Sequence, residues 1–491
     1  MMEHLPILVV VVPMLAAPAC LLFERGKSAW LFSILACLIS LLLSALLLQQ
    51  VVTGGPISYE LGGWSAPWGI EFRADPLSAF VLLLVSAIAS TVIIAAHRSL
   101  QAELAEPQQP FFYVLFLICV CGLLGIVASG DVFNVFVFLE ISSLASYALV
   151  ALGRERQALR AAFQYLVVGT IGATFFLVGI GFLYSLSGTL NMAELAVLLP
   201  DIEERRLLTV AFAFILVGIG LKLAIFPLHG WLPNAYTYAP SIATALLAAT
   251  ATKVSLYLLI RFYFDVFGGV ATLLPVDAVL LVVGITAALV ASLVAIQQSN
   301  VKRLFAFSSI AQIGYMAVGI GLGSAAGLQA SLLHLFNHAL MKAALFIALA
   351  AVVYRQGGCQ LEHFRGLGRS MPWTMAGLLI AALSLVGVPL TAGFISKWYL
   401  VLASLESGYW PIAVLVLVAS FLALFYVWKI VEVAYFEPTS DNPHAELREA
   451  PGTLLVPLWI LVVANLYFGI DTRLPVGGSA SAAAFMFGGA P

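Results

Sequence analysis

Seven ionisable residues stand inside stretches of the sequence that are otherwise strongly apolar. They are Glu140, Lys222, Lys253, His334, His338, Lys342 and Lys397. Charged groups within a membrane-spanning segment are costly, and they face a protein interior or water, where they mark ion and proton pathways. Carboxylate, amine and imidazole groups all bind and release protons, so the chemistry that this set predicts is proton transfer.

Glu140 and Lys222 form the first predicted pair. Burial lowers the affinity of a lysine for its proton, whereas a nearby carboxylate raises it. A glutamate that approaches and retreats would therefore switch the lysine between holding and releasing a proton. The alternatives are a static salt bridge, or a structural hydrogen bond from Ser142 or Ser143 to Glu140.

Two further lysines, Lys253 and Lys397, follow prolines that interrupt apolar runs. Pro227 follows Lys222 by five residues, Lys253 lies in the next apolar run, and Pro389 precedes Lys397. Proline removes a backbone donor and clashes with the preceding turn, so we expect broken helices at both places. We predict that Lys253 receives the proton and that Lys397 is the outlet. The alternatives are bonding of Lys253 to carbonyls freed by the break, and an interfacial anchor role for Lys397.

His334, His338 and Lys342 are spaced i, i+4, i+8 and therefore share one helix face. They span about 12 Å along the helix axis at 1.5 Å per residue. Because histidine titrates near neutral pH, the stack is a candidate relay. The pattern His-x3-His also occurs in zinc sites, but no cysteine or carboxylate lies nearby in sequence to complete one, so we predict no metal. A polar contact between helices is the remaining alternative.

The composition is that of a polytopic membrane protein. The chain is 62% hydrophobic and 9% charged, with a mean hydropathy of +1.07 and a net charge of −2, whereas soluble domains are roughly 25% charged. Nucleic-acid binding is excluded. The five cysteines are scattered and read as small core residues. No cysteine cluster, flavin motif or haem ligand pair is present, so we expect no cofactor, and any redox chemistry would belong to partner subunits.

The apolar segments predict an all-α fold with about fourteen transmembrane helices in a single membrane domain over residues 1–491. The seventh and twelfth segments continue, after a proline, into the shorter pieces 228–239 and 391–404. A helix needs about 20 residues to cross the bilayer. The candidate spans are 4–23, 28–52, 74–97, 111–129, 131–151, 159–187, 207–226, 242–267, 273–297, 301–322, 326–355, 372–390, 409–436 and 452–470.

The two predicted breaks stand in mirrored order. Lys222 precedes Pro227, whereas Lys397 follows Pro389. Inverted repeats place broken helices and charges in this way, near the middle of the membrane. We therefore expect two inverted five-helix repeats, over about residues 111–267 and 273–436.

Lysine and arginine in the loops predict the orientation, because loops on the cytoplasmic side carry the excess of positive charge. With the N-terminus outside, the inside loops hold twelve such residues: Arg25, Lys27, Arg98, Arg154, Arg156, Arg160, Lys302, Arg303, Arg355, Arg365, Arg369 and Arg448. The outside loops hold five: Arg73, Arg205, Arg206, Arg261 and Arg473. Both termini are expected on the periplasmic or extracellular side, and the longest polar loop, Glu437–Pro451, in the cytoplasm.

Four motifs carry a resemblance to a known superfamily. They are FLEISSLASYALV at residues 138–150, PLHGWLPNAYTYAP at 227–240, LFNHALMKAALF at 335–346 and GVPLTAGFISKW at 387–398. Together they resemble the antiporter-like subunits of respiratory complex I, membrane-bound hydrogenases and the multisubunit Mrp-type cation/proton antiporters. The resemblance implies fourteen helices, two inverted repeats and a central hydrophilic axis. It makes Glu140 and Lys222 the input pair, Lys253 and the His338 region the connection, and Lys397 the terminal lysine.

Within this superfamily, the stretch NAYTYAPSIATALLAATATK (residues 234–253) and the lysine at 397 look most like the D-type subunit of the Mrp-type Na+/H+ antiporter. The resemblance implies a subunit that is not an enzyme by itself, moves protons in exchange for Na+, and works with other membrane subunits in a bacterial inner membrane. The alternative is the proton-pumping membrane subunit of an NADH:quinone oxidoreductase or a membrane-bound hydrogenase.

Overall fold

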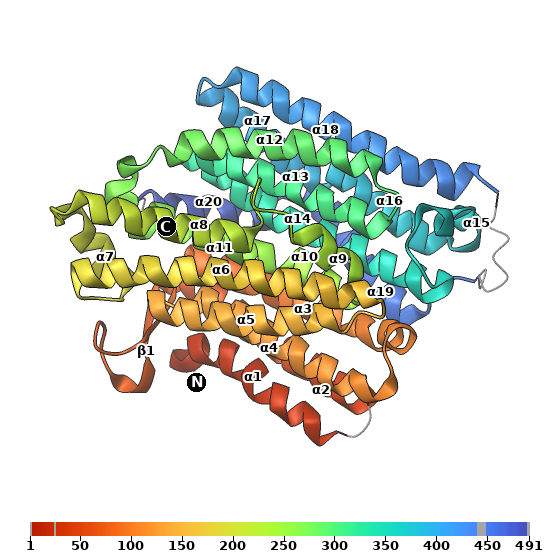
Figure 1. Cartoon of the computed structure of the whole chain (residues 1–491), viewed down its shortest axis with the longest axis horizontal. Coiled ribbons are helices and arrows are strands. Elements are labelled where there is room, and N and C mark those ends of the chain that lie inside the picture. Colours follow the sequence, from red (N-terminus) through yellow and green to blue (C-terminus); the bar gives the residue numbers. More distant parts are fainter. Residues whose placement is uncertain (1, 24–25, 439–447, 489–491) are drawn as a thin grey trace.

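Long helices run side by side along the long axis of the molecule (Figure 1). The computed structural model describes residues 2–23, 26–438 and 448–488. In the first half of the chain the helices are α1 (Leu5–Ala19), α2 (Gly26–Gly54), α3 (Pro76–Glu103), α4 (Gln109–Ala128), α5 (Val132–Ala151), α6 (Arg156–Ser187), α7 (Met192–Leu198), α8 (Arg205–Leu223), α9 (Leu232–Tyr238), α10 (Ser241–Ala249) and α11 (Ala251–Ile260).

The second half of the chain repeats this pattern of long helices. They are α12 (Val276–Gln297), α13 (Val301–Gly321), α14 (Ala325–Gln356), α15 (Leu367–Ser370), α16 (Pro372–Val386), α17 (Ala392–Glu406), α18 (Trp410–Val431), α19 (Gly452–Ile470) and α20 (Arg473–Met486). Short π-helical turns extend α11 over Arg261–Val266 and α18 over Glu432–Phe436. A small antiparallel hairpin of β1 (Ile57–Glu60) and β2 (Glu71–Ala74) pairs Ile57 with Ala74 and Glu60 with Glu71.

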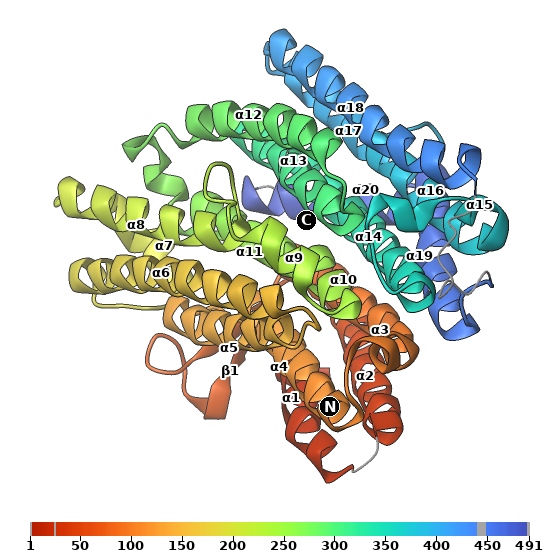
Figure 2. The ribbon, with the colours of Figure 1, turned by 45° about the vertical axis from the view of Figure 1, so that its right-hand side comes forward.

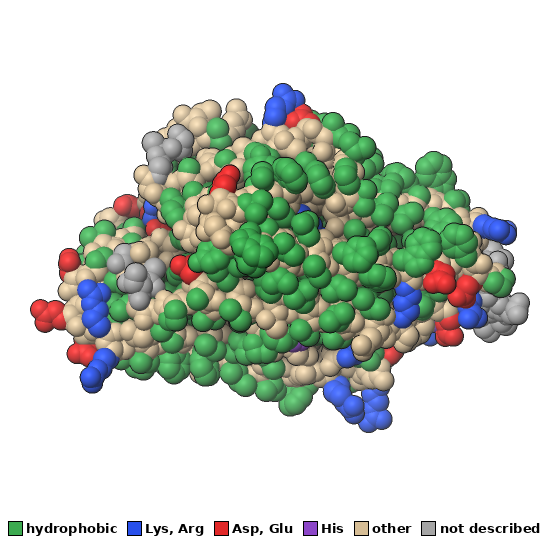
Figure 3. All heavy atoms as spheres, turned by 90° about the horizontal axis from the view of Figure 1, so that it is seen from above, with side chains coloured by type: hydrophobic (Ala, Val, Ile, Leu, Met, Phe, Trp, Pro, Cys, Tyr) green, Lys and Arg blue, Asp and Glu red, His purple; other side chains and the backbone are tan. Residues whose placement is uncertain are grey.

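The predicted membrane spans are confirmed. Among the described residues, thirteen helical segments are long and apolar enough to cross a membrane, and α16 is a shorter apolar helix. Each of the fourteen coincides with a predicted span. Figure 3 shows why the sides of the molecule suit lipid: hydrophobic side chains cover its middle, and most charged side chains gather toward its two ends.

Both predicted helix breaks are present. The first separates α8 from α9 and begins at Ala224, whose φ of 56° is left-handed; the second separates α16 from α17 and begins at Gly387, with φ 92°. A left-handed residue ends an α-helix because it turns the following N–H away from the helix axis. Pro227 and Pro389 then prevent the helix from resuming at once.

Helix α14 is the core of the molecule. Almost every residue between Gly327 and Val352 is buried, because other helices of the bundle surround α14. It packs against α3, α10, α13, α16, α17, α19 and α20. Figures 1 and 2 both show it between the α8–α11 segment and the α16–α18 segment. His334, His338 and Lys342 of α14 are therefore in the protein interior.

Glycines bring helices close together in both halves of the chain. A Cβ at Gly218 of α8 would lie 2.7 Å from the carbonyl of Gly172 in α6, and a Cβ at Gly284 of α12 would lie 2.7 Å from the carbonyl of Gly314 in α13. Small residues permit such contact between helix backbones, which is the main packing device within a membrane.

Several elements were absent from the sequence prediction. They are the β1–β2 hairpin, the short helix α7, the C-terminal helix α20, and an interruption at Thr250 between α10 and α11. The hairpin lies near both ends of the described chain, because His4 hydrogen-bonds to Tyr59 and Arg73 lies over the ring of Phe485. Of the predicted loop residues, Arg25 and residues 439–447 of the loop Glu437–Pro451 lie outside the described part.

Candidate functional site

Glu140 and Lys222 are in direct contact. The Lys222 Nζ donates to Glu140 Oε1 at 3.2 Å, to Ser143 Oγ at 2.8 Å and to Tyr147 OH at 3.2 Å. Lys222 lies in the last turn of α8, and its three partners lie on one face of α5, at spacings of i, i+3 and i+7. The ammonium is buried, whereas the side chain of Glu140 is 25% exposed. The partners Ser143 and Tyr147 were not predicted, although their spacing from Glu140 contains the signal.

A small cavity adjoins Lys222. It has a volume of about 30 Å³ and is lined by Lys222, by Ser142, Ser143 and Ser146 of α5, and by Ala251 and Ser255 of α11, among others. A cavity of ~10–15 Å³ with two or more polar partners is large enough for a water molecule. The cavity therefore adjoins both Lys222 and α11, the helix that carries Lys253, and serine hydroxyls form part of its lining.

Lys253 is completely buried and binds to a helix end. Its Nζ donates to the carbonyl of Ala248 and, at 3.3 Å, to Thr252 Oγ1. The carbonyl is free because Thr250, with φ −126° and ψ −54°, interrupts the helix. The Thr250 hydroxyl donates to the carbonyl of Leu246 at 2.7 Å, a back-bond that bends helices. Lys253 thus binds a freed carbonyl, at an interruption within its own span. That span contains neither proline nor glycine, so its sequence does not indicate the interruption.

His334, His338 and Lys342 lie on one face of α14, as predicted. The rings of the two histidines are parallel, with centroids 5.9 Å apart. His334 lies between Ser396 Oγ and Gln312 Oε1, both at 2.9 Å from its ring nitrogens. Lys342 donates to the Phe305 carbonyl at 2.8 Å and to Ser308 Oγ at 2.5 Å.

His338 differs from its neighbours. Both of its ring nitrogens are buried, and neither has a hydrogen-bond partner among the described residues. The ring interacts electrostatically with Lys253, Lys342, His334 and Lys397. A buried polar group without a partner is unusual and requires an explanation. His338 is thus the central member of a five-residue cluster to which Lys253 and Lys397 also belong.

Lys397 lies just after the second break, in α17. Its Nζ donates to the carbonyls of Leu385 at 2.9 Å and Val386 at 3.0 Å, and it lies 4.9 Å from the centroid of the Tyr315 ring. Those carbonyls are the last of α16, where the helix dipole favours a cation. The side chain is buried, so the position is not that of an interfacial anchor. Asn337 of α14 ties the break to the core by donating to the Ala392 carbonyl.

Two side chains in the first break lie differently from what their types suggest. His229 stacks on Phe226, with centroids 5.2 Å apart, and its Nδ1 has no hydrogen-bond partner among the described residues. Trp231 is buried, although tryptophan near the end of a membrane span is typical of an interfacial anchor. Its Nε1 donates to the Leu221 carbonyl at 2.9 Å, and its ring stacks on Tyr165 at 4.0 Å. Trp231 therefore supports the end of α8 that carries Lys222.

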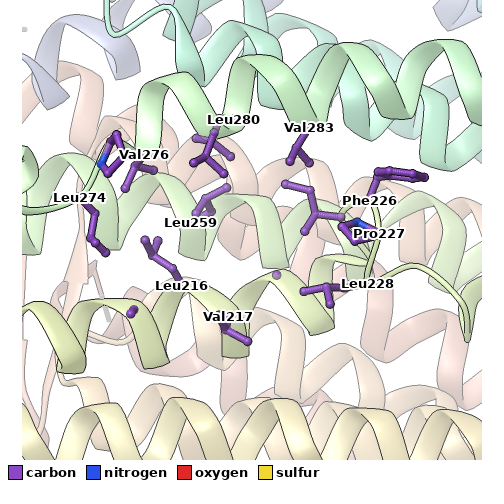
Figure 4. A pocket seen from close by; sticks show the side chains of 15 residues that line it. Leu216, Val217, Phe226, Pro227, Leu228, Leu259, Leu274, Val276, Leu280 and Val283 are labelled. Carbon is purple, nitrogen blue, oxygen red and sulfur yellow. The ribbon is translucent and has the colours of Figure 1, made fainter.

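An apolar cavity of about 380 Å³ borders the other side of this break (Figure 4). Figure 4 shows Leu216 and Val217 of α8, Phe226–Leu228 of the break and Leu280 of α12 around it. Only apolar residues line it, so it provides no group for proton transfer. Among the described residues, no group of three or more histidine, cysteine, aspartate or glutamate side chains is placed to hold a metal ion.

The fold and the buried charges define a class: membrane subunits of the antiporter type, in which paired charges and broken helices lie inside a bundle of transmembrane helices. A family model described as "NADH:quinone oxidoreductase/Mrp antiporter, TM" matches residues 129–423. The chain belongs to this family, which confirms the resemblance seen in the sequence.

Known relatives come from both branches of the family. The chain is 40% identical over 487 residues to the N-type subunit of the NADH-quinone oxidoreductase of Desulforudis audaxviator, with 96% of each chain covered. It is 32% identical over 475 residues to the D-type subunit of the Na(+)/H(+) antiporter of Alkalihalophilus pseudofirmus, with 95% of this chain and 94% of the relative covered. A chain of the membrane-bound sulfane sulfur reductase, an archaeal respiratory membrane complex, matches with a TM-score of 0.90, 31% identity and 98% coverage of both chains. The protein is thus a multi-pass membrane subunit similar to antiporter and respiratory subunits alike.

Proposed function

We propose that this chain is the proton-translocating subunit of a multisubunit monovalent cation (Na+)/proton antiporter. Protons move along Glu140, Lys222, Lys253 and His338 to Lys397, with His334 and Lys342 completing the cluster around His338. The observation that supports the proposal most strongly is that Lys222 contacts Glu140 and also lines a cavity that reaches α11.

The steps of the relay follow from the contacts. While Glu140 stays at 3.2 Å, Lys222 holds its proton; when the carboxylate retreats, the buried ammonium loses its compensation and releases the proton toward the cavity. Lys253 accepts it on the far side. Neither ring nitrogen of His338 has a hydrogen-bond partner in the described part of the chain, so the ring can accept a proton from Lys253 and pass it toward Lys397 without first breaking a hydrogen bond.

Partner subunits are part of the proposal. Glu140 is one-quarter exposed within a membrane span, where contact of a carboxylate with lipid would be costly. A neighbouring subunit that covers α5 removes this cost. The matched archaeal chain is part of a membrane complex, which supports the same organisation.

We place the protein in a bacterial inner membrane with both termini in the periplasm. Of the five positive residues assigned to the outside, Arg261 is buried and bonded to Asp75 and Asp265, so four remain as loop charges. The positive-inside rule is therefore satisfied more strongly than the sequence count alone suggests.

The second candidate function is proton pumping within a redox complex, and the relative that is 40% identical favours it. In that case the same proton path would be driven by electron transfer in partner subunits. The two functions share the relay and differ in what drives it.

The test is transport by the purified intact complex in proteoliposomes. With an imposed pH gradient and no redox substrate, addition of Na+ is expected to dissipate the gradient, and Lys222→Ala is expected to abolish this response. Dependence of proton movement on NADH or another electron donor, with no response to Na+, would assign the redox function instead. Full Na+-driven exchange by the assembled Lys222→Ala complex would remove the relay from either function.

A further inference from the structure

Helix α10 carries opposite charges at its two ends. At its N-terminus, the carboxylate of Glu103 accepts from the Ser241 N–H at 2.9 Å and from the Ser241 hydroxyl at 3.1 Å. At its C-terminus, the ammonium of Lys253 donates to the Ala248 carbonyl. A helix dipole favours an anion at its N-terminus and a cation at its C-terminus. The nine-residue helix thus has a compensating charge at each end.

The side chain of Glu103 is mostly buried and hydrogen-bonded. Its side chain is 12% exposed and also accepts from Ser99 Oγ at 2.8 Å. The Lys302 ammonium lies 3.9 Å from it and donates to the Ala239 carbonyl at 3.2 Å, two residues before α10 begins. Glu103 and Lys302 therefore hold the same helix end together.

This helix end opens onto polar hollows at the end of the molecule predicted to be cytoplasmic. Glu103 lines two of them, with volumes of about 450 and 400 Å³. The titratable groups that share these hollows with Glu103 are Arg154, Glu155, Tyr238, Lys302 and Cys359. Glu103 is thus in contact with both the hollows and α10.

Rigidity makes α10 a suitable connection. All nine of its residues are buried, and it packs against α3 and α14. It is followed by the interruption at Thr250, and its Ala248 carbonyl accepts from the Lys253 ammonium. At 1.5 Å per residue the helix is about 14 Å long. The Tyr236 hydroxyl donates to the Leu247 carbonyl beside this helix end, and the titratable groups that interact electrostatically with Lys253 are His334, His338 and Lys342.

We propose that Glu103 is a positioning residue for Lys253: through α10, its charged carboxylate sets the position and the electrostatic environment of the Ala248 carbonyl that binds the lysine. The inference rests on the proposed role of Lys253 in proton transfer. It assigns to Glu103 a function that its place at the end of a transmembrane helix does not reveal, namely control of the middle of the relay from the aqueous face.

The test compares Glu103→Gln with Glu106→Gln, an exposed acid three residues further on, in the intact complex. Loss of a charge about 14 Å from Lys253 is expected to move the pH of half-maximal exchange down by roughly half a pH unit or more, by Coulomb's law at an effective dielectric constant of ~20. Glu106→Gln is expected to leave the pH profile unchanged. Glu103→Asp, which keeps the charge, is expected to show the wild-type pH profile.

Lys302→Gln provides an independent test, because it is expected to shift the pH of half-maximal exchange in the opposite direction. Removal of this cation is expected to shift the pH of half-maximal exchange upward, whereas a merely structural cap would give no opposed pair of shifts. An assembled Glu103→Gln complex with the wild-type pH profile would overturn the inference. Shifts of the same sign in Glu103→Gln and Lys302→Gln would overturn it too. If Glu103→Gln does not assemble, an unshifted pH profile of Lys302→Gln overturns it. Lys253→Ala separates the two proposals: full activity in that variant contradicts the relay itself, whereas loss of activity there with an unshifted Glu103→Gln profile contradicts only the role of Glu103.

Discussion

The two interrupted helices hold their lysines in different ways. At the first break, Lys222 binds the side chains of Glu140, Ser143 and Tyr147, and the nearby Leu221 carbonyl is taken by Trp231. At the second break, Lys397 binds the freed carbonyls of α16 directly. A helix break beside a lysine therefore does not determine whether side chains or backbone carbonyls bind that lysine.

The difference concerns whether the compensating charge can move. A helix C-terminus carries about half a negative charge whose position is set by the backbone. A carboxylate carries a full charge on a side chain that can change rotamer. The first break is therefore suited to a switch, and the second to a constant environment.

The largest effect is expected when the movable charge is removed. Glu140→Ala and Lys222→Ala should each reduce pH-gradient-driven exchange to background, because either change removes one member of the ion pair that switches the lysine between holding and releasing its proton. Exchange in vesicles and assembly of the complex are the measurements, with exposed Glu155→Ala as the matched control. Full exchange in both assembled variants would show that the pair is only structural.

At the second break, Lys397→Ala should block proton transfer on one side of the membrane with little loss of stability. No carboxylate is left unpaired, and each lost hydrogen bond contributes only about 1 kcal/mol. Lys429→Ala is the matched control, because its ammonium also binds two carbonyls, those of Ile296 and Gln298 at 3.1 Å, away from the cluster. Proton flux measured from each side should fall only in the first variant; equal flux in both would limit Lys397 to binding the end of α16.

The backbones of the two breaks should respond oppositely to exchange of glycine and alanine. Ala224→Gly removes a left-handed alanine (φ 56°) and should raise stability by up to about 1 kcal/mol, whereas Gly387→Ala should lower it by about 1–2 kcal/mol. The added Cβ would also lie 3.0 Å from Cδ of Lys397. Thermal unfolding of the purified complex measures both, and Gly477→Ala, with open space around its Cβ, is the control. Shifts of the same sign would contradict the assigned conformations.

The smallest effect is expected at Trp231. Trp231→Phe removes one donor to the Leu221 carbonyl, worth about 1 kcal/mol, and keeps an aromatic ring against Tyr165. Exchange should fall by roughly two- to fivefold, as a shift of that size implies. Trp410→Phe, at an exposed ring, should have no effect. Equal rates for the two variants would mean that the first break needs no side-chain support.

Much of the architecture was accessible from the sequence, because the physical signals are strong. A span requires about 20 apolar residues, and proline and glycine interrupt helices visibly, so the fourteen spans and two breaks were predicted. The ionisable residues of the site stand out for the same reason, and the structure brings Glu140 to Lys222 and gathers the others around His338.

The remaining features depend on tertiary contacts. The interruption at Thr250 has no breaker residue, and it is stabilised by a side-chain hydrogen bond that threonine makes in many intact helices. Trp231 has the sequence context of an interfacial residue, and only the position of Tyr165 shows that it is buried. The boundaries of the two inverted repeats and the transport role of each residue stay predictions.

The unengaged ring of His338 has a consequence for the direction of transport. Its two nitrogens have no hydrogen-bond partner among the residues that the structure describes, so the ring can turn toward either neighbour without breaking a hydrogen bond. The centre of the proposed relay is therefore reversible, with no preference for one side of the membrane. Direction must come from the ends, where Glu140 and Lys397 differ, and from the gradient that drives them, so the same chain would run forward or backward as that gradient changes sign.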